Sequence, residues 1–395
     1  MTEDVKRLVA AGRALRSAAP YQLPTAVREV LCGRYGAQSA DLHLVDYGLT
    51  VLQPVSTTHS PPEHALPVHG SAAGRAFGAQ QPFVTQDEDG RVCVHLPVTV
   101  RGNRLGVLSV TFEPGARLDT EVEELAEVAR LLGHEVVVAE RDTDLYQWAR
   151  RRDRLTLAAE MQWQLLPARS CSGPEYALGA QLEPAYAIFG DNFDWSTSAD
   201  RLLLYVTNGM GEGIEAAFLT SLGINALRNA RRAGLPVADQ AALADQALFA
   251  RYRGEAYLSV LLVDLELASG TVRIVDAGSP RMLLLREGTV SRVDLDAQLP
   301  LGMFEETDYT AQELRLRPGD RLLFVSDGVH SVVAPGGEEY GERALARAVM
   351  ATRLLPAADV PAAVLRELSS HRGRPDGDDD ALVVCLDWFG KEPTV

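Results

Sequence analysis

The pattern of apolar and polar positions divides the chain into three stretches, and the first is a mixture of helices and strands. Two helical segments open it, the first of them amphipathic (MTEDVKRLVAAGRALR). Strand-like runs follow in ADLHLVDYGLTVLQPV, which turns at Tyr47-Gly48, and in RVCVHLPVTV and RLGVLSVTFE, which are joined by a turn over residues 101–104. Between these runs, SAAGRAFGAQQPFVT combines a helix of small residues with a strand. This order predicts an α/β domain over residues 1–116.

The second stretch, residues 117–168, reads as one long helix that Pro167 ends. Apolar residues recur in it at alternating spacings of four and three: Leu118, Val122, Leu125, Ala129, Leu132, Val136 and Ala139. Two interpretations of this seam stay open. It faces the same seam of a twin chain and makes a coiled-coil homodimer, or it packs on the first domain. Beyond Asp142 the pattern becomes charged, which predicts a helical connector.

The third stretch, residues 169–395, contains runs of buried strands flanked by helices. This arrangement is typical of an α+β sandwich and not of a regular βαβ repeat. The strand candidates are RLLLYV, YLSVLLVDLEL, TVRIVDAG, RMLLLREG, DRLLFVSDG and ALVVCLDW, and the helix candidates are IEAAFLTSLGINALRNARRAG, residues 239–252, YGERALARAVMATR and PAAVLRELSSH.

Composition and charge limit the classes of molecule that the chain is expected to bind. A chain of 395 residues is too long for one compact core, which agrees with several domains. The formal net charge of -16 argues against non-specific binding to nucleic acid and suits a protein that collects divalent cations. No apolar run is long enough to span a bilayer, and the four cysteines lie far apart, so we expect a cytoplasmic protein with structural thiols and no membrane partner.

Aspartates recur beside glycines or in a cluster at the ends of predicted strands. Asp191 follows Gly190, Asp327 precedes Gly328, and residues 378–380 are three aspartates before ALVVCL. Each Asp-Gly pair alone is most often a turn. Carboxylates that leave several strands toward one cleft, however, make an oxygen site for Mg²⁺ or Mn²⁺. Their joint appearance favours a metal site.

The glycines at positions 209, 211 and 213 suggest a rival function. A strand, a glycine-rich loop and a helix together can bind a nucleotide phosphate. The spacing is G-x-G-x-G and not G-x-G-x-x-G, and no second strand with an acidic end follows about twenty residues later. The pattern therefore disfavours a dinucleotide-binding fold.

Two resemblances add to these predictions. The order of the first stretch, with G-S-A-A-G-R-A-F and then L-P-V and G-N-R-L-G-V-L, resembles a GAF sensor domain. The region from Leu155 to Trp388 resembles the sporulation and stress-response branch of the bacterial protein phosphatase 2C (PP2C) family. Its motifs are AAEMQWQLLP, EPAYAIFGDNFDW, NGMGEGIEAA, DAGSPRMLL, LPLGM, LRPGDRLLFVSDGV and DDDALVVCL. For the first domain, a small-molecule sensor and a structural dimerisation module both remain open.

The phosphatase resemblance implies a two-metal site and an α-β-β-α sandwich. Asp191 bridges two Mn²⁺ or Mg²⁺ ions, Asp327 and Asp378 complete one of them, and the Gly209 carbonyl serves the second. Where the family has an aspartate, this chain has Asn208, which lacks the negative charge that offsets a cation. The second site is therefore expected to be weaker, unless Asp194 or Glu212 supplies the charge through a water molecule.

The implied function is a metal-dependent protein serine/threonine phosphatase that uses a metal-activated water. Its implied substrate is a phosphorylated regulatory protein such as an anti-sigma-factor antagonist, and the N-terminal sensor is expected to regulate it through the connector helix. The alternative is a pseudophosphatase that binds a phosphoprotein or a metal without turnover, because Asn208 replaces a ligand.

Overall fold

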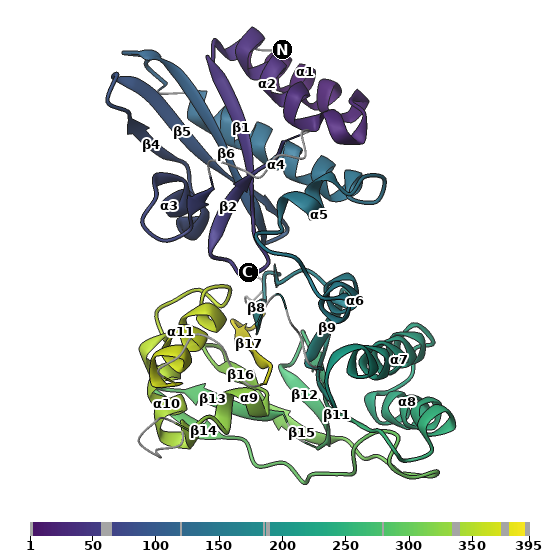
Figure 1. Ribbon diagram of the computed structural model, residues 1–395. Helices are drawn as coiled ribbons and strands as arrows, with labels where there is room; N and C mark the ends of the chain where they lie inside the picture. The colour runs from purple at the N-terminus through teal and green to yellow at the C-terminus, as the bar shows by residue number, and fades with distance from the viewer. Residues whose placement is uncertain are drawn as a thin grey trace. The chain divides into compact units, whose positions relative to one another are not determined.

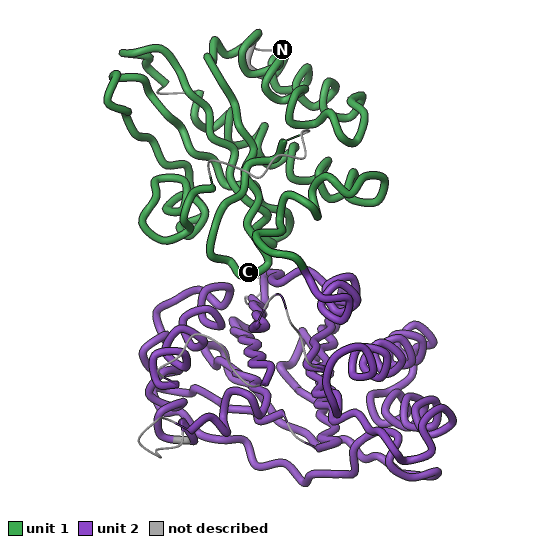
Figure 2. The backbone as a smooth tube through the Cα atoms, in the orientation of Figure 1, with its two compact units in different colours: residues 1–154 green, residues 155–395 purple. Residues whose placement is uncertain are grey.

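The structure, a computed structural model, describes residues 3–56, 65–118, 121–184, 186, 190–278, 280–333, 340–372 and 379–391. It divides into two compact units, residues 1–154 and 155–395 (Figures 1 and 2). Each unit has its own sheets and its own core, so each is considered separately. The sequence-based boundaries at residues 116 and 168 stay a prediction about domain organisation.

Unit 1 is built on one antiparallel sheet with the strand order β3-β2-β1-β6-β5-β4. The predicted hairpin turns are present. Arg101 and Gly102 both have positive φ, at 50° and 87°, which is the conformation of a tight hairpin turn between β5 and β6. The strands are β1 Ser39–Val45, β2 Val51–Pro54, β3 Leu66–Pro67, β4 Phe83–Gln86, β5 Arg91–Val100 and β6 Asn103–Pro114.

Helices cover both faces of this sheet. On one face, α2 (Leu23–Tyr35) and α4 (Glu121–Ala139) bury their apolar residues against the strands, and α1 (Glu3–Ser17) packs on these two helices. On the other face, α3 (Ala72–Ala79) packs Ala73 and Phe77 against Val107. The short elements η1 (Pro20–Gln22) and α5 (Leu145–Ala149) are joined by a hydrogen bond from the Tyr146 hydroxyl to the Pro20 carbonyl.

The prediction of one helix over residues 117–166 is wrong. The chain forms three helices instead, α4, α5 and α6 (Leu157–Leu165). The apolar seam at spacings of four and three ends at Ala139, and the buried residues Tyr146 and Ala149 belong to the separate short helix α5. A new helix then begins where the Thr156 hydroxyl accepts a hydrogen bond from the Ala159 N–H at 3.1 Å.

The seam itself packs on its own unit. Leu125, Leu132 and Val136 are fully buried in the core of unit 1, beside residues of α1, α2 and the sheet. Of the two interpretations, packing on the first domain is therefore the one that the structure favours. These side chains are not available to a twin helix.

Unit 2 contains two antiparallel sheets, as predicted (Figure 1). Helices α7 (Gly213–Arg232) and α8 (Val237–Tyr252) cover the first sheet, and α10 (Gly341–Ala351) and α11 (Val360–Arg372) cover the second. The first sheet has the order β15-β12-β11-β10-β9, with β9 Asn192–Thr197, β10 Arg201–Gly209, β11 Leu258–Glu266, β12 Thr271–Ala277 and β15 Gln312–Arg315. The second has the order β14-β13-β16-β17-β8-β7, with β7 Ser170–Ser172, β8 Tyr176–Glu183, β13 Arg281–Arg286, β14 Thr289–Arg292, β16 Arg321–Val325 and β17 Ala381–Trp388.

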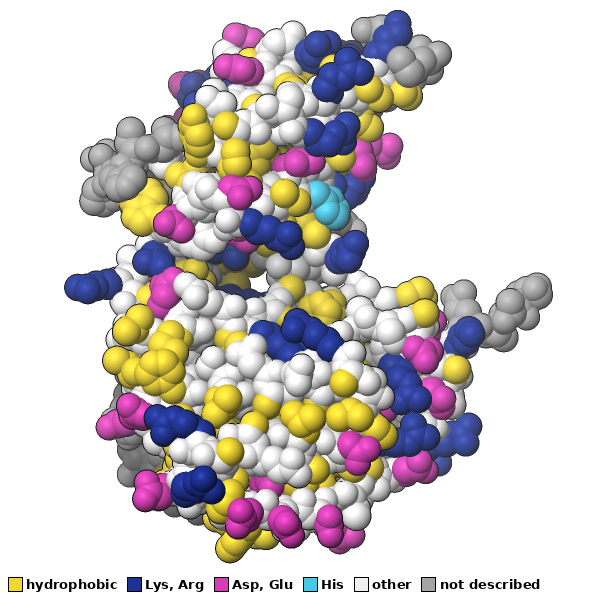
Figure 3. Space-filling view, turned by 90° about the vertical axis from the view of Figure 1, so that its right-hand side faces the viewer, with side chains coloured by type: hydrophobic (Ala, Val, Ile, Leu, Met, Phe, Trp, Pro, Cys, Tyr) yellow, Lys and Arg dark blue, Asp and Glu magenta, His cyan; other side chains and the backbone are white. Residues whose placement is uncertain are grey.

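The surface and the thiols add two observations. On the faces seen in Figure 3, acidic and basic side chains are interspersed over both units. All four cysteines are free thiols, and burial raises the pKa of Cys171 to about 11, which makes this thiol unreactive. Within the described ranges, no helix has the length and apolar character needed to cross a membrane.

Candidate functional site

Four strand ends of unit 2 bring Asp191 and Asp327, two of the predicted aspartates, together with Asp380. Asp191 immediately precedes β9, and Asn208 and Gly209 end β10. On the second sheet, Asp327 begins the short helix α9 (Asp327–His330), two residues after β16 ends. Asp380 immediately precedes β17. The hydrogen bonds below join these ends, so the site lies where the two sheets meet.

Asp380 ties the second sheet to the loop before Asp191. Its Oδ2 atom accepts hydrogen bonds from the Gly190 N–H at 2.7 Å and from the Asp191 N–H at 3.0 Å. Only 1% of Asp380 is exposed. A buried carboxylate that accepts two backbone N–H groups is firmly held, and it fixes the chain that carries Asp191.

A second link joins Asn208 to Asp327. The Asn208 Nδ2 atom donates to Asp327 Oδ1 at 2.5 Å, and the Gly328 N–H donates to the same oxygen at 3.0 Å. The asparagine thus gives the carboxylate a hydrogen-bond donor at the place where an aspartate would need a cation between the two groups.

The electrostatics of Asp191 are unusual. Burial raises its pKa well above the ordinary value, Asp380, Asp327 and Asp379 raise it further, and a hydrogen bond with Ser326 opposes these effects. Its Oδ2 atom is buried and has no hydrogen-bond partner in the described part of the chain. A buried carboxylate oxygen without a partner, surrounded by three other carboxylates, is an environment that a cation would stabilise.

Asp378 lies outside the described residues, so its predicted role as a ligand stays a prediction. The next residue, Asp379, is described, and its pKa is raised by burial and by Asp327. In the sequence, Asp379 and Asp380 form one cluster with Asp378, but only Asp378 is expected to be a ligand. β17 begins at Ala381, so Asp379 and Asp380 are the two residues directly before a buried strand. This position at a strand end was the signal that the sequence offered.

Two residues are candidates to supply the missing charge, and the structure describes both. Asp194 is buried and makes ion pairs with Arg228 at 2.7 Å and with Arg231 at 2.9 Å, so two arginines of α7 already neutralise it. Glu212 is exposed at the N-cap of α7 and makes no side-chain capping bond. The expectation for Asp194 is therefore wrong, and nothing in the described residues supports the one for Glu212.

Glycines allow the loops of the site to approach one another. A Cβ atom at Gly190 would overlap the Gly209 carbonyl, and a Cβ atom at Gly328 would overlap the Asp380 carbonyl. The Asp327-Gly328 pair, which resembles an ordinary turn in the sequence, is thus a close backbone contact between two strand ends.

The donors present are the oxygen ligands that Mg²⁺ and Mn²⁺ prefer. Among the residues that the structure describes, no three His, Cys, Asp or Glu side chains are grouped closely enough to hold an ion as they stand. The buried, unpartnered oxygen of Asp191, which lies among other carboxylates, is the observation that fits a cation.

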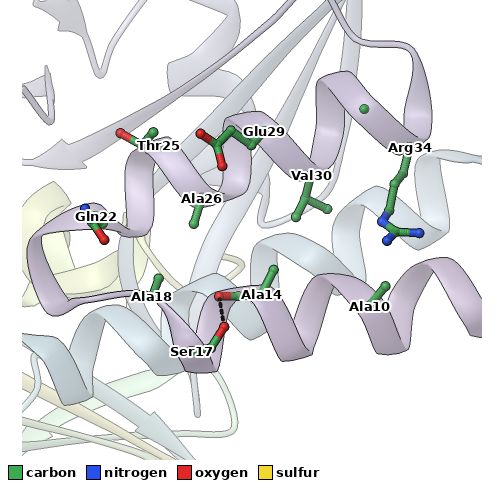
Figure 4. Close-up of a pocket in the computed structure, with 11 residues that line it drawn as sticks. Ala10, Ala14, Ser17, Ala18, Gln22, Thr25, Ala26, Glu29, Val30 and Arg34 are labelled. Carbon is green, nitrogen blue, oxygen red and sulfur yellow. Dashed lines mark hydrogen bonds between the residues drawn. The ribbon is translucent and has the colours of Figure 1, made fainter.

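A groove of a different kind lies in unit 1, between α1 and α2 (Figure 4). Its volume is about 680 Å³, and small side chains such as Ala10, Ala14 and Ala26 line much of it. A hydrogen bond from Ser17 Oγ to the Ala14 carbonyl stays within α1. The lining has no cluster of carboxylates or histidines, so nothing there suggests catalysis.

Comparison with known proteins agrees with this geometry. Residues 198–389 match the family model of Stage II sporulation protein E (SpoIIE). The Stage II sporulation protein E of Bacillus subtilis (strain 168) is 24% identical over 143 residues, which are 36% of this chain and only 17% of that protein. The chain therefore covers a small part of this relative.

Comparison with solved structures supports the same fold for this part of the chain. The SiaA-PP2C domain of Pseudomonas aeruginosa has a TM-score of 0.50 and 20% identity, over 58% of this chain and 93% of that one. The RsbU and RsbW domains of a Mycobacterium tuberculosis protein have a TM-score of 0.48 and 23% identity, over 56% of this chain and 63% of that one. The structure of RsbX in complex with magnesium has a TM-score of 0.43 and 15% identity, over 55% of this chain and 98% of that one. Residues 198–389 thus match the SpoIIE family model, and the C-terminal half of the chain contains a domain with the PP2C fold.

Proposed function

We propose that unit 2 hydrolyses phosphoserine or phosphothreonine in a protein, with two Mn²⁺ or Mg²⁺ ions. The observation that carries this proposal is the buried Asp191 carboxylate. One of its oxygens has no partner, and Asp327, Asp379 and Asp380 surround it. Such a concentration of negative charge is costly in a fold unless a cation offsets it.

Each residue of the site has its own role in this proposal. Asp191 and Asp327 would hold the ions, with Asp379 as a third carboxylate and Asp378 retained from the sequence prediction. The Gly209 carbonyl and the Asn208 amide oxygen would serve the more weakly bound ion. When bound, the ions supply charge that neutralises phosphoryl oxygens and activates a water molecule. The role of Asp380 is to orient Asp191, through the hydrogen bonds that it accepts from two backbone N–H groups.

A pseudophosphatase is the second candidate, and one observation favours it. Asn208 donates a hydrogen bond to Asp327, which satisfies this carboxylate without a cation. If the contact persists at cellular metal concentrations, the domain would bind a phosphoprotein and leave its phosphate intact.

The two candidates are separated by a titration with Mn²⁺ and with Mg²⁺, using a phosphoserine peptide as substrate. We expect wild type to release phosphate only at high metal concentration, Asn208→Asp to reach its maximum at lower concentration, and Asp327→Asn to lose activity. Asp239→Asn is the matched control, because Asp239 is exposed on α8, away from the site. An inactive wild type with an active Asn208→Asp would favour the pseudophosphatase.

The substrate and the regulation are also proposed. The family resemblance supports a phosphorylated anti-sigma-factor antagonist as the substrate, in the cytoplasm. The sheet of unit 1, with α1, α2 and α4 on one face and α3 on the other, supports a GAF-like sensor. The interruption of the connector removes the argument for a rigid helical link, so regulation rests on the resemblance alone. Equal activity and equal regulation after removal of residues 1–154 would refute it.

A further inference from the structure

Thr220 contacts the candidate site from α7, although it has no metal-binding role. The residue is fully buried. Threonines inside helices commonly bond to the carbonyl four residues earlier. The Thr220 hydroxyl instead donates to the Gly190 carbonyl at 2.9 Å, thirty residues away in the sequence.

This hydrogen bond acts on the peptide group that joins Gly190 to Asp191. The carbonyl of that group accepts from the Thr220 hydroxyl and also from the Gly209 N–H at 3.2 Å. The N–H of the same group donates to Asp380 Oδ2 at 3.0 Å. Both ends of the peptide plane are therefore held. Because this plane precedes the Asp191 Cα atom, its orientation helps to set the direction of the Asp191 carboxylate.

The packing leaves no room for a substitute. A Cβ atom at Gly209 would lie 2.5 Å from Thr220 Oγ1. The hydroxyl thus fits directly against the backbone at the end of β10. If it were lost, no water molecule could enter between these groups without moving them apart.

We propose that Thr220 is a positioning residue for the metal site, one that orients Asp191 and holds Gly209 beside it. The inference rests on the proposed function in that it takes Asp191 and Gly209 as metal-binding groups. It concerns geometry alone, since Thr220 touches neither an ion nor a substrate.

The test compares Thr220→Val, which keeps the shape and removes the hydroxyl, with Thr220→Ser, which restores it. Mn²⁺ binding to the full chain is measured by isothermal titration calorimetry, with no substrate present. We expect Thr220→Val to weaken binding roughly 3- to 10-fold, the equivalent of one hydrogen bond, and Thr220→Ser to recover most of the affinity. Thr352→Val is the matched control, because Thr352 is buried elsewhere in unit 2 and donates to the Val349 carbonyl.

A purely structural role gives a different result. Thr220→Val would then lower the melting temperature in EDTA and leave the Mn²⁺ affinity unchanged, which would overturn the inference. Binding of Mn²⁺ without phosphate release from any substrate would refute the proposed function. The positioning role would still be supported or refuted by the Mn²⁺ affinities of the Thr220 variants.

If wild type binds no Mn²⁺, a second measurement tests the positioning role. Amide hydrogen exchange at Gly190 and Asp191 in the metal-free protein should be faster in Thr220→Val than in wild type or Thr220→Ser. Equal exchange in all three proteins would overturn the positioning role.

Discussion

Replacing Asn208 by aspartate tests whether its contact with Asp327 takes the place of a cation. The substitution removes a hydrogen bond to a charged group, which contributes about 1.5–3 kcal/mol. It also places two carboxylates in contact, and like charges about 4 Å apart repel by about 4 kcal/mol at the effective dielectric constant near a protein surface. Protonation and movement of the side chains relieve part of the repulsion. We therefore expect the metal-free variant to lose about 2–4 kcal/mol of the free energy of unfolding.

Metal should reverse this loss, because a cation between two carboxylates turns their repulsion into attraction. The assay is urea unfolding in EDTA and in Mn²⁺, followed by tryptophan fluorescence, since Trp163, Trp195 and Trp388 all lie in unit 2. Asn225→Asp on the exposed face of α7 controls for the added charge. If Asn208→Asp is as stable as wild type in EDTA and gains nothing more from Mn²⁺, the reasoning about this contact is refuted.

Three further predictions concern packing, an ion network and pH. Leu132→Ala should cost unit 1 about 2–4 kcal/mol without changing the sedimentation coefficient, whereas Val138→Ala, at a side chain that is 59% exposed, should cost less than about 0.5 kcal/mol. A change in association state caused by Leu132→Ala would contradict the packing of the seam inside unit 1. Asp194→Asn leaves Arg228 and a second arginine of α7 without their buried partner and should lower the free energy of unfolding by about 3–5 kcal/mol in urea; a loss below about 1 kcal/mol would show that these arginines find other partners. Burial lowers the pKa of His43 against the opposing effect of Asp41, so its contribution to stability is fully present above about pH 6.5, its unfolded value, and is lost as the pH falls. The urea midpoint of unit 1 should therefore fall less between pH 7.5 and pH 5 in His43→Gln than in wild type, and equal slopes would argue against this assignment.

The strands and helices of unit 2 could be predicted because their signals are local. Runs such as RLLLYV and YLSVLLVDLEL are apolar over the length of one strand, and the structure places β10 and β11 there. The connector could not be predicted in the same way. A seam at spacings of four and three has the same pattern whether it faces a twin chain or its own sheet. The N-cap of α6 is a single residue, Thr156, among residues that favour helix, so the sequence does not mark it as a break.

The same distinction applies to the site. Asp191 and Asp327 could be found because aspartate beside glycine at a strand end is visible in one segment. The role of Asp380 and the whole contribution of Thr220 could not, because each acts through backbone groups of the Gly190 loop, which lies 190 and 30 residues away in the sequence. Contacts at such separations follow from tertiary structure and leave no periodic signal in the chain.

The close contacts at Gly190 and Gly328 have a consequence for how such domains change over evolutionary time. A side chain that faces the site, such as Asn208, can change its type while the backbone keeps its course. The two glycines have no such freedom, because any side chain would collide with a neighbouring carbonyl. A lineage that has given up catalysis should therefore keep these glycines for as long as it keeps the fold. Gly190 and Gly328 are thus required by the shape of the backbone at the site, independently of the acids beside them.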